Sequence, residues 1–220
     1  MLERDLSFDA ASVAVVLTGL AVVGLLLAEW RGSQAGKWVA KPAASCGFLA
    51  VAWLAGAFEH SYGRGLMLGL VLCAVGDVLL IPPGTGRAFL LGIASFALGH
   101  AAYAWAFVAR GVHVIASSIA FAGMLAVVVL VLRWLGPRLP SDMRLPLRFY
   151  MAVIALMVAA AVGVSVRSGD SAIAVGAIAF ALSDLSVARD RFVRAQLVNV
   201  LWGLPLYYFA QLLLAFTSAH

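Results

Sequence analysis

Eight long apolar runs, separated by short polar connections, constrain this chain more than any other feature. A helix needs roughly 20 apolar residues to cross the hydrocarbon core of a bilayer. Only helices and closed barrels satisfy their backbone hydrogen-bonding groups in lipid. The runs therefore predict an all-α, polytopic membrane bundle, with residues 1–220 forming a single integral membrane domain. The predicted spans are about 11–29, 42–58, 64–81, 87–108, 112–133, 147–166, 171–188 and 193–216.

Composition and charge support this class. The chain is 64% hydrophobic and 11% charged, whereas soluble domains are about 45–50% apolar and about 25% charged. Its net charge of +5 comes from basic residues between the apolar runs, which topogenesis alone explains, so we do not predict nucleic-acid binding. Most Lys and Arg residues lie in or beside the first, third, fifth and seventh connections. The positive-inside rule then predicts a multi-pass protein of the cytoplasmic (inner) membrane, with both termini outside the cytoplasm.

Two carboxylates lie inside apolar runs, Asp77 in the third and Asp184 in the seventh. A charge at membrane depth costs roughly 2.5 kcal/mol or more, so two at matched positions call for an explanation. A shift of 107 residues aligns Asp184 with Asp77, Arg148 with Lys41 and Tyr207 with His100. This weak repeat favours a parallel 4+4 duplication about an axis along the membrane normal. The alternative is that two four-span halves align only through their loop charges.

Residues at four-residue spacing place both carboxylates against protein. In the third span the stripe is Gly65, Gly69, Cys73 and Asp77, and small residues at this spacing let helices approach closely. From the helical rise, both aspartates lie ~7 Å from the cytoplasmic ends of their helices. The same layer is expected to hold Ser45, Gly92 to Ser95 and Asn199, with Lys41 and Arg87 just above it. His100, Tyr103 and Tyr207 are predicted to lie deeper, with His100 out of direct reach of Asp77.

Two acids in an apolar cavity suit general acid–base chemistry, because one of them can stay protonated beside the other, ionised one. A zinc site would need three protein ligands, and His60, His113 and His220 fall in loops or at the chain end. We therefore predict no metal and no cofactor. The chain also lacks a Gly-x-Ser-x-Gly nucleophile elbow, so the sequence gives no support for a serine hydrolase.

Several short motifs together are similar to the YhhN/TMEM86 family. They are Lys41-Pro42, Gly76-Asp77-x-x-Leu80, Phe96-x-x-x-His100-x-x-Tyr103 and Gly176-Ala177-x-x-Phe180-x-x-Ser183-Asp184. The resemblance implies a lysoplasmalogenase, which hydrolyses the vinyl ether bond of a lysophospholipid to a fatty aldehyde and a glycerophospho-choline or -ethanolamine. It also implies that Asp77 and Asp184 are the catalytic pair, and it leaves open which is the acid. The predicted substrate-binding residues are Lys41, Ser45, Ser95, His100, Tyr103, Ser183, Asn199 and Tyr207.

Two other classes of function stay open from the residues alone. Paired intramembrane acids and internal repeats are also typical of proton-coupled transporters for small molecules or lipids. Alternatively, the aspartates only pair with Lys41 or Arg148 in a lipid-binding or assembly protein. Aldehyde release from purified protein favours the enzyme, and flux into liposomes favours the transporter.

Overall fold

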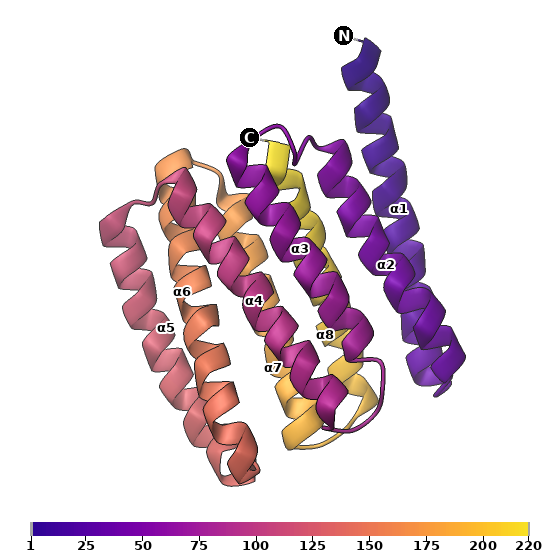
Figure 1. Cartoon of the computed structure of the whole chain (residues 1–220), viewed down its shortest axis with the longest axis vertical. Helices are drawn as coiled ribbons and strands as arrows, with labels where there is room; N and C mark the ends of the chain where they lie inside the picture. The colour runs from indigo at the N-terminus through magenta and orange to yellow at the C-terminus, as the bar shows by residue number, and fades with distance from the viewer. Residues whose placement is uncertain (1, 220) are drawn as a thin grey trace.

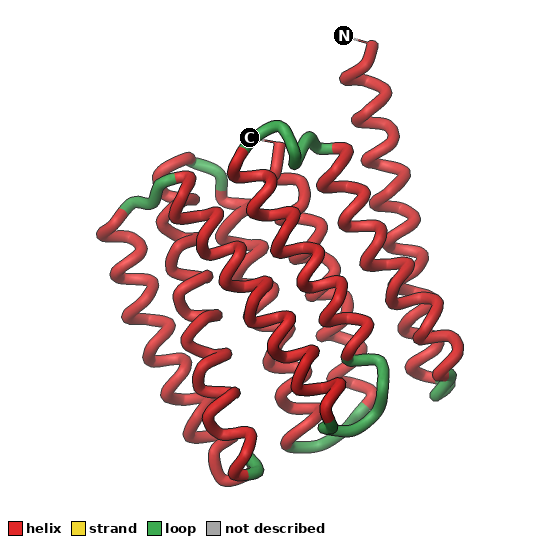
Figure 2. Tube along the Cα trace, in the orientation of Figure 1, coloured by secondary structure: helices red, strands yellow, loops and turns green. Residues whose placement is uncertain are grey.

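The computed structural model describes residues 2–219, with side chains for residues 10–219. Over this range the chain forms eight α-helices and three short 3-10 turns, without any strand. The helices are α1 (Leu2–Trp30), α2 (Gln34–Leu54), α3 (Ser61–Leu79), α4 (Arg87–Arg110), α5 (Val114–Leu135), α6 (Arg144–Ser168), α7 (Ser171–Phe192) and α8 (Leu197–Phe216). They run side by side and are joined by short loops (Figures 1 and 2). The predicted all-α membrane bundle is therefore confirmed.

Seven of the eight helices in the described range are long and apolar enough to cross a membrane, and α2 is the exception. It begins at Gln34 rather than at residue 42, so Lys37 and Lys41 are helical and lower its hydropathy. Its start is set by Ser33, whose side chain accepts a hydrogen bond from the backbone N–H of Gly36 (3.1 Å), as an N-cap residue does. The early start holds Lys41 on a regular helix that packs against α3 and α8.

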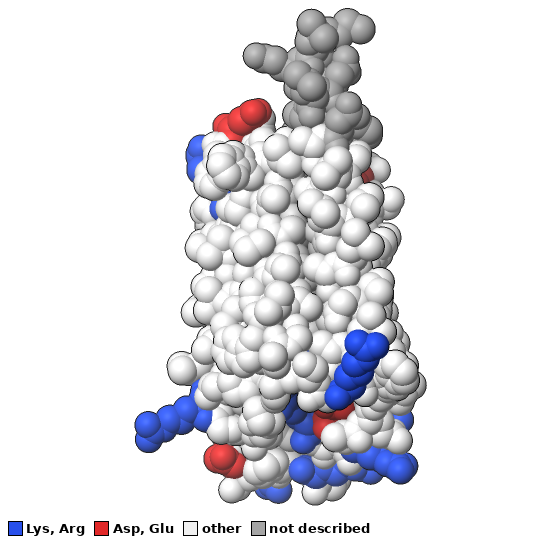
Figure 3. Space-filling view, turned by 90° about the vertical axis from the view of Figure 1, so that its right-hand side faces the viewer, with Lys and Arg blue, Asp and Glu red and all other residues white. Residues whose placement is uncertain are grey.

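Consecutive helices alternate in direction, so both chain ends lie at one end of the bundle (Figure 1). The connections that follow α1, α3, α5 and α7 lie at the other end, which we call the basic end. Lys and Arg side chains gather there on the face shown in Figure 3. This is the asymmetry expected for the positive-inside rule. Which side of a membrane each end faces stays a prediction.

The pattern of neighbouring helices repeats between the two halves. The pairs α1–α2, α2–α3 and α3–α4 have counterparts in α5–α6, α6–α7 and α7–α8. Across the halves, α4 packs against α6 and α8 packs against α2. The correspondence is incomplete, because α1 also packs against α8, whereas α5 packs mainly against α6. This arrangement is consistent with the predicted parallel duplication.

The predicted small-residue stripes face protein. Gly65, Gly69, Cys73 and Asp77 are all buried on α3, and an added Cβ at Gly65 would lie 2.8 Å from the Ala106 side chain of α4. Gly176 on α7 is similarly close to Leu214 on α8, at 2.9 Å. These close approaches bring α3 against α4 and α7 against α8, which places both aspartates inside the bundle.

Candidate active site

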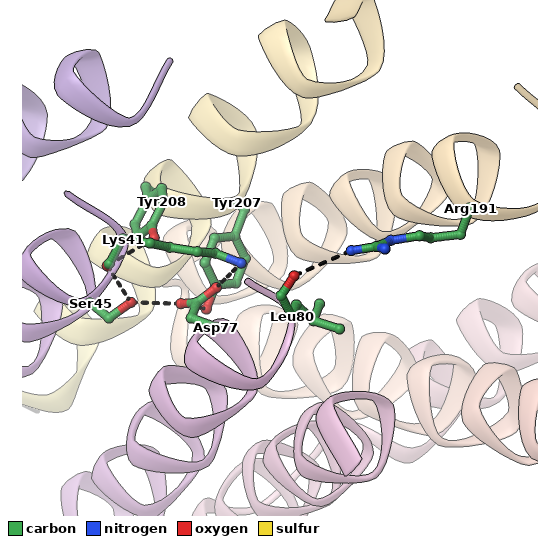
Figure 4. A network of polar contacts seen from close by, with 7 residues as sticks. All are labelled: Lys41, Ser45, Asp77, Leu80, Arg191, Tyr207 and Tyr208. Carbon is green, nitrogen blue, oxygen red and sulfur yellow. Dashed lines mark hydrogen bonds and ion pairs between the residues drawn. The ribbon is translucent and has the colours of Figure 1, made fainter. Parts of the chain in front are cut away.

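Asp77 lies near the basic end of α3 and receives hydrogen bonds from two different helices (Figure 4). Its side chain is 2% exposed. Ser45 on α2 and Tyr207 on α8 each donate a hydroxyl hydrogen to Oδ2, both at 2.7 Å. The Lys41 Nζ lies 3.3 Å from Oδ1. Because all three partners donate and one is a cation, this environment suits an ionised carboxylate.

Asp184 on α7 has different neighbours and is more open, with 16% of its side chain exposed. The Tyr150 hydroxyl of α6 donates to Oδ2 at 3.1 Å, and the His100 Nε2 of α4 lies 3.3 Å from the same oxygen. His100 Nδ1 is 2.7 Å from the Phe96 carbonyl oxygen. A carbonyl only accepts, so Nδ1 carries a hydrogen. Nε2 therefore faces Asp184 with a lone pair or a second hydrogen, and the pair can hold one proton between them.

Helix direction explains how these side chains meet. Side chains tilt toward the N-terminus of their helix. Since α3 and α7 end at the basic end, Asp77 and Asp184 tilt away from it, whereas His100 and Tyr207 tilt toward it from α4 and α8. The sequence placed these latter residues in a deeper layer, using backbone rise alone. The structure shows that the two layers meet, with Tyr207 on Asp77 and His100 on Asp184.

Each aspartate is contacted by a residue from the other half of the chain. Tyr207 of the second half contacts Asp77, and His100 of the first half contacts Asp184. Tyr207 and His100 are also the residues that align under the shift of 107. The two aspartates thus occupy equivalent positions, and each is contacted by residues of both halves.

Both carboxylates line one cavity of about 90 Å³ between the basic-end halves of the central helices. Lys41, Tyr150 and Tyr207 line it as well. A cavity that holds a water needs roughly 10–15 Å³ of such volume, so this one has room for several waters or for a small reacting group. Around the polar groups its walls are apolar, with residues Leu80, Phe89, Ile93, Phe96, Leu147, Val187, Phe192 and Leu204.

The hydroxyl groups of three other predicted binding residues donate to acceptors other than the two carboxylates. Ser183 lines the cavity, but its hydroxyl donates to the Phe180 carbonyl at 2.7 Å. The Ser95 hydroxyl donates to the Leu72 carbonyl at 2.6 Å, joining α4 to α3. Tyr103 is fully buried and donates to Gln211 Oε1 at 2.6 Å. The Ser95 and Tyr103 bonds join α4 to α3 and to α8, whereas the Ser183 bond lies within α7.

A polar pocket of about 240 Å³ continues the cavity toward the basic end. The two spaces share Lys41, Leu80, Ser186, Val187 and Leu204 as lining residues. Its charged and amide side chains are Glu29, Gln34, Lys37, Lys41, Asp190, Arg191 and Asn199. Both signs of charge are therefore present, as a zwitterionic ligand requires.

Asn199 lies in this pocket with one side-chain atom free. Its Nδ2 donates to Asp190 Oδ1 at 3.0 Å and to the Arg194 carbonyl at 2.8 Å. Its Oδ1 is buried and has no hydrogen-bond partner among the described residues. A buried acceptor left unpaired costs free energy, so it can accept a hydrogen bond from a bound ligand.

Sequence reasoning missed Tyr150 and Arg191. Tyr150 follows Arg148 by half a turn in an apolar helix, and no sequence signal distinguishes it from a packing residue. Arg191 belongs to a basic connection that topogenesis explains. In the structure its guanidinium donates to the Leu80 carbonyl at 3.2 Å (Figure 4) and to the Gly84 carbonyl at 2.8 Å. It also lies over the Phe89 ring, 5.0 Å from the centroid.

Within the described residues, no group of three or more His, Cys, Asp and Glu side chains is arranged to hold a metal ion.

The fold and this site define an integral membrane protein of α-helices with two carboxylates facing one internal cavity. The YhhN family profile matches residues 36–218, so the chain belongs to the YhhN family. It is 30% identical over 174 residues to a lysoplasmalogenase of Mycobacterium tuberculosis (strain CDC 1551 / Oshkosh), covering 73% of this chain and 62% of that protein. It is 32% identical over 161 residues to lysoplasmalogenase TMEM86B of Sus scrofa, covering 70% and 63%.

A third relative is lysoplasmalogenase TMEM86A of Bos taurus, which is 30% identical over 167 residues, covering 72% of this chain and 67% of that protein. The matches thus span less than two thirds of the mycobacterial and pig relatives. No solved structure matches the chain.

Proposed function

We propose that the chain is a hydrolase of the cytoplasmic membrane that cleaves the vinyl ether bond of lysoplasmalogens. The observation that carries the proposal is the single cavity in which Asp77 and Asp184 face the same space with different neighbours. The relatives named lysoplasmalogenase support the same reaction. The products are a fatty aldehyde and a glycerophospho-choline or -ethanolamine.

The proton for the reaction comes from the Asp184–His100 pair. Protonation of the vinyl carbon not bonded to oxygen converts the carbon–carbon double bond into an oxocarbenium ion. His100 Nε2 and the Tyr150 hydroxyl both face Asp184 Oδ2, so they hold the reacting carboxyl group in place. General acid catalysis of this kind contributes about 10²–10⁴-fold in rate.

Asp77 supplies the negative charge and the base. Its carboxylate stabilises the oxocarbenium ion and accepts a proton from the water that attacks the oxygen-bonded carbon of that ion. The resulting hemiacetal then breaks its bond to the glycerol oxygen, which takes the proton from Asp77. The hemiacetal hydroxyl loses its proton to the Asp184–His100 pair as the aldehyde forms. One water is consumed, and both residues return to their starting states.

The headgroup lies in the polar pocket, above the reacting bond. Lys41 and Arg191 line this pocket and supply N–H donors for the phosphate. Asp190 and the free Oδ1 of Asn199 supply acceptors for an ammonium group or a glycerol hydroxyl. Of the basic residues at this end of the bundle, Lys37, Lys41 and Arg191 line the pocket and are the headgroup partners. Arg87 and Arg189 do not line it.

Purified protein should release aldehyde from a lysoplasmalogen. The matched control substrate is the saturated alkyl ether with the same headgroup, which offers no double bond to protonate and should release none. Transport of the lysolipid across proteoliposome membranes without aldehyde release would reject the hydrolase proposal. It would favour a transporter that uses the same carboxylates.

A further inference from the structure

An apolar groove of about 480 Å³ lies beside the reactive cavity. α6 forms its floor, because both α5 and α7 pack against α6. α5 is peripheral in the bundle, with Leu135 as its only buried residue. The groove is lined by one face of each helix, including Gly123 and Leu135 of α5, Tyr150 of α6, and Ile178 and Asp184 of α7.

The groove and the reactive cavity are continuous. Leu147, Tyr150, Asp184 and Ala188 line both. Among the described residues that line the groove, only Tyr150 and Asp184 have polar side chains, and both lie at the end that meets the cavity. On α5 the lining runs from Ala120 to Leu135, which is about 22 Å at the rise of an α-helix.

We infer that this groove holds the hydrocarbon chain of the substrate and sets which carbon reaches Asp184. The inference rests on the proposed function. A polar ligand would need hydrogen-bonding partners along its length, and past Asp184 the groove offers apolar side chains alone. Polar pocket, reactive cavity and apolar groove therefore follow one another in the order of headgroup, ether bond and chain.

A chain that leaves the bilayer for the groove gains little from hydrophobic burial, because lipid tails are as apolar as the groove. The groove instead positions the hydrocarbon chain so that the vinyl carbon lies at Asp184. Its length should therefore appear as a dependence of kcat/KM on chain length, and not as general tight binding of apolar compounds.

Gly123 offers a way to shorten the groove. It lines the groove, and a Cβ added there meets nothing within 4 Å. From Leu135, near the cavity, it is about 18 Å along α5. Gly123→Phe should lower kcat/KM for a long-chain lysoplasmalogen by about 10-fold or more, as lost fit in an apolar pocket does. A short-chain substrate should keep its wild-type value within about 2-fold.

Gly19 provides the matched control, because it is an exposed helical glycine on α1 whose added Cβ also meets nothing within 4 Å. Gly19→Phe should leave both substrates unchanged. Equal effects of Gly123→Phe on long and short chains, or no effect on either, would overturn the inference.

A second readout does not depend on turnover. A saturated ether lysolipid with a photoreactive diazirine at its chain end should label α5 and α7 near Gly123 and Ile178 in the wild-type protein. Labels spread over all membrane-facing helices would contradict the inference. Labelling in the groove by a protein that releases no aldehyde would retain the hydrocarbon site and reject the proposed reaction.

Discussion

Asp77 and Asp184 occupy equivalent places on α3 and α7, but their neighbours differ in charge and in exposure. Asp77 is 2% exposed and receives a cation and two hydroxyl donors. Asp184 is 16% exposed, beside a histidine and a tyrosine at the mouth of the apolar groove. Two carboxylates at equivalent places therefore differ in their surroundings because different helices supply their neighbours, α2 and α8 for Asp77 and α4 and α6 for Asp184.

Substitution of Asp184 should have the largest effect on activity. Asp184→Asn removes the proton donor, and we expect kcat to fall by about 10²–10⁴-fold. Thermal unfolding of the purified protein should change little, because the oxygen of the asparagine amide can still accept the hydrogen bond from the Tyr150 hydroxyl.

Asp142 is the matched control for this substitution, since it is exposed in the connection between α5 and α6. Asp142→Asn should retain wild-type aldehyde release. An Asp184→Asn protein with wild-type activity would remove Asp184 from the mechanism.

In contrast to Asp184, substitution of Lys41 should strongly lower the free energy of unfolding. Lys41→Met leaves the Asp77 carboxylate buried without its cation, which costs about 3–5 kcal/mol when one partner of a buried pair is removed. The Lys41→Met/Asp77→Asn protein should recover most of this loss. Equilibrium unfolding in detergent of the wild type, Lys41→Met, Asp77→Asn and the double variant completes the double-mutant cycle.

Lys37 sharpens this result, because its partner Glu29 is more exposed than Asp77. Lys37→Met should cost only about 0–1 kcal/mol, as expected for a pair near water. Equal destabilisation by the two lysine variants would contradict the buried ion pair at Asp77.

His100 should have a smaller effect on rate and a distinct effect on the pH profile. His100→Gln keeps a side chain near Asp184 but removes the second proton-holding group, so we expect kcat to fall by about 10-fold, at the low end for an acid–base group. The basic limb of the kcat/KM profile should move, because that limb reports the proton on the pair. A reduced rate with an unmoved basic limb would give His100 a packing role only.

Arg191 should have the smallest effect among these, confined to binding. Arg191→Met removes a charged donor from the headgroup pocket, so KM should rise by about 10-fold while kcat changes little. Arg189→Met is the matched control, since Arg189 does not line the pocket. The same change in KM from both variants would indicate a general electrostatic effect.

Much of this comparison could be predicted from the sequence. Apolar length predicted the eight helices, and four-residue spacing predicted that Asp77 and Asp184 face protein. Counting residues from the predicted cytoplasmic ends of the third and seventh spans placed both acids in one layer. The structure shows them lining one cavity. These features depend on local periodicity, which a single sequence records.

The partners of each aspartate could not be predicted in the same way. They depend on which helices are neighbours and on how each helix is rotated, which are properties of the packed bundle. Backbone rise alone did not predict the contacts of His100 and Tyr207 with the aspartates, because it ignores the opposite tilt of side chains on antiparallel helices. The groove depends on the peripheral position of α5, and the uniformly apolar sequence of that helix does not indicate which face lines it.

The most direct test of unequal roles is the pH dependence of kcat/KM in the two aspartate variants. A bell-shaped profile has an acidic limb from the base, which must be ionised, and a basic limb from the acid, which must be protonated. We predict that residual activity of Asp77→Asn loses the acidic limb and that residual activity of Asp184→Asn loses the basic limb. Loss of the basic limb in Asp77→Asn and of the acidic limb in Asp184→Asn would contradict the assignment.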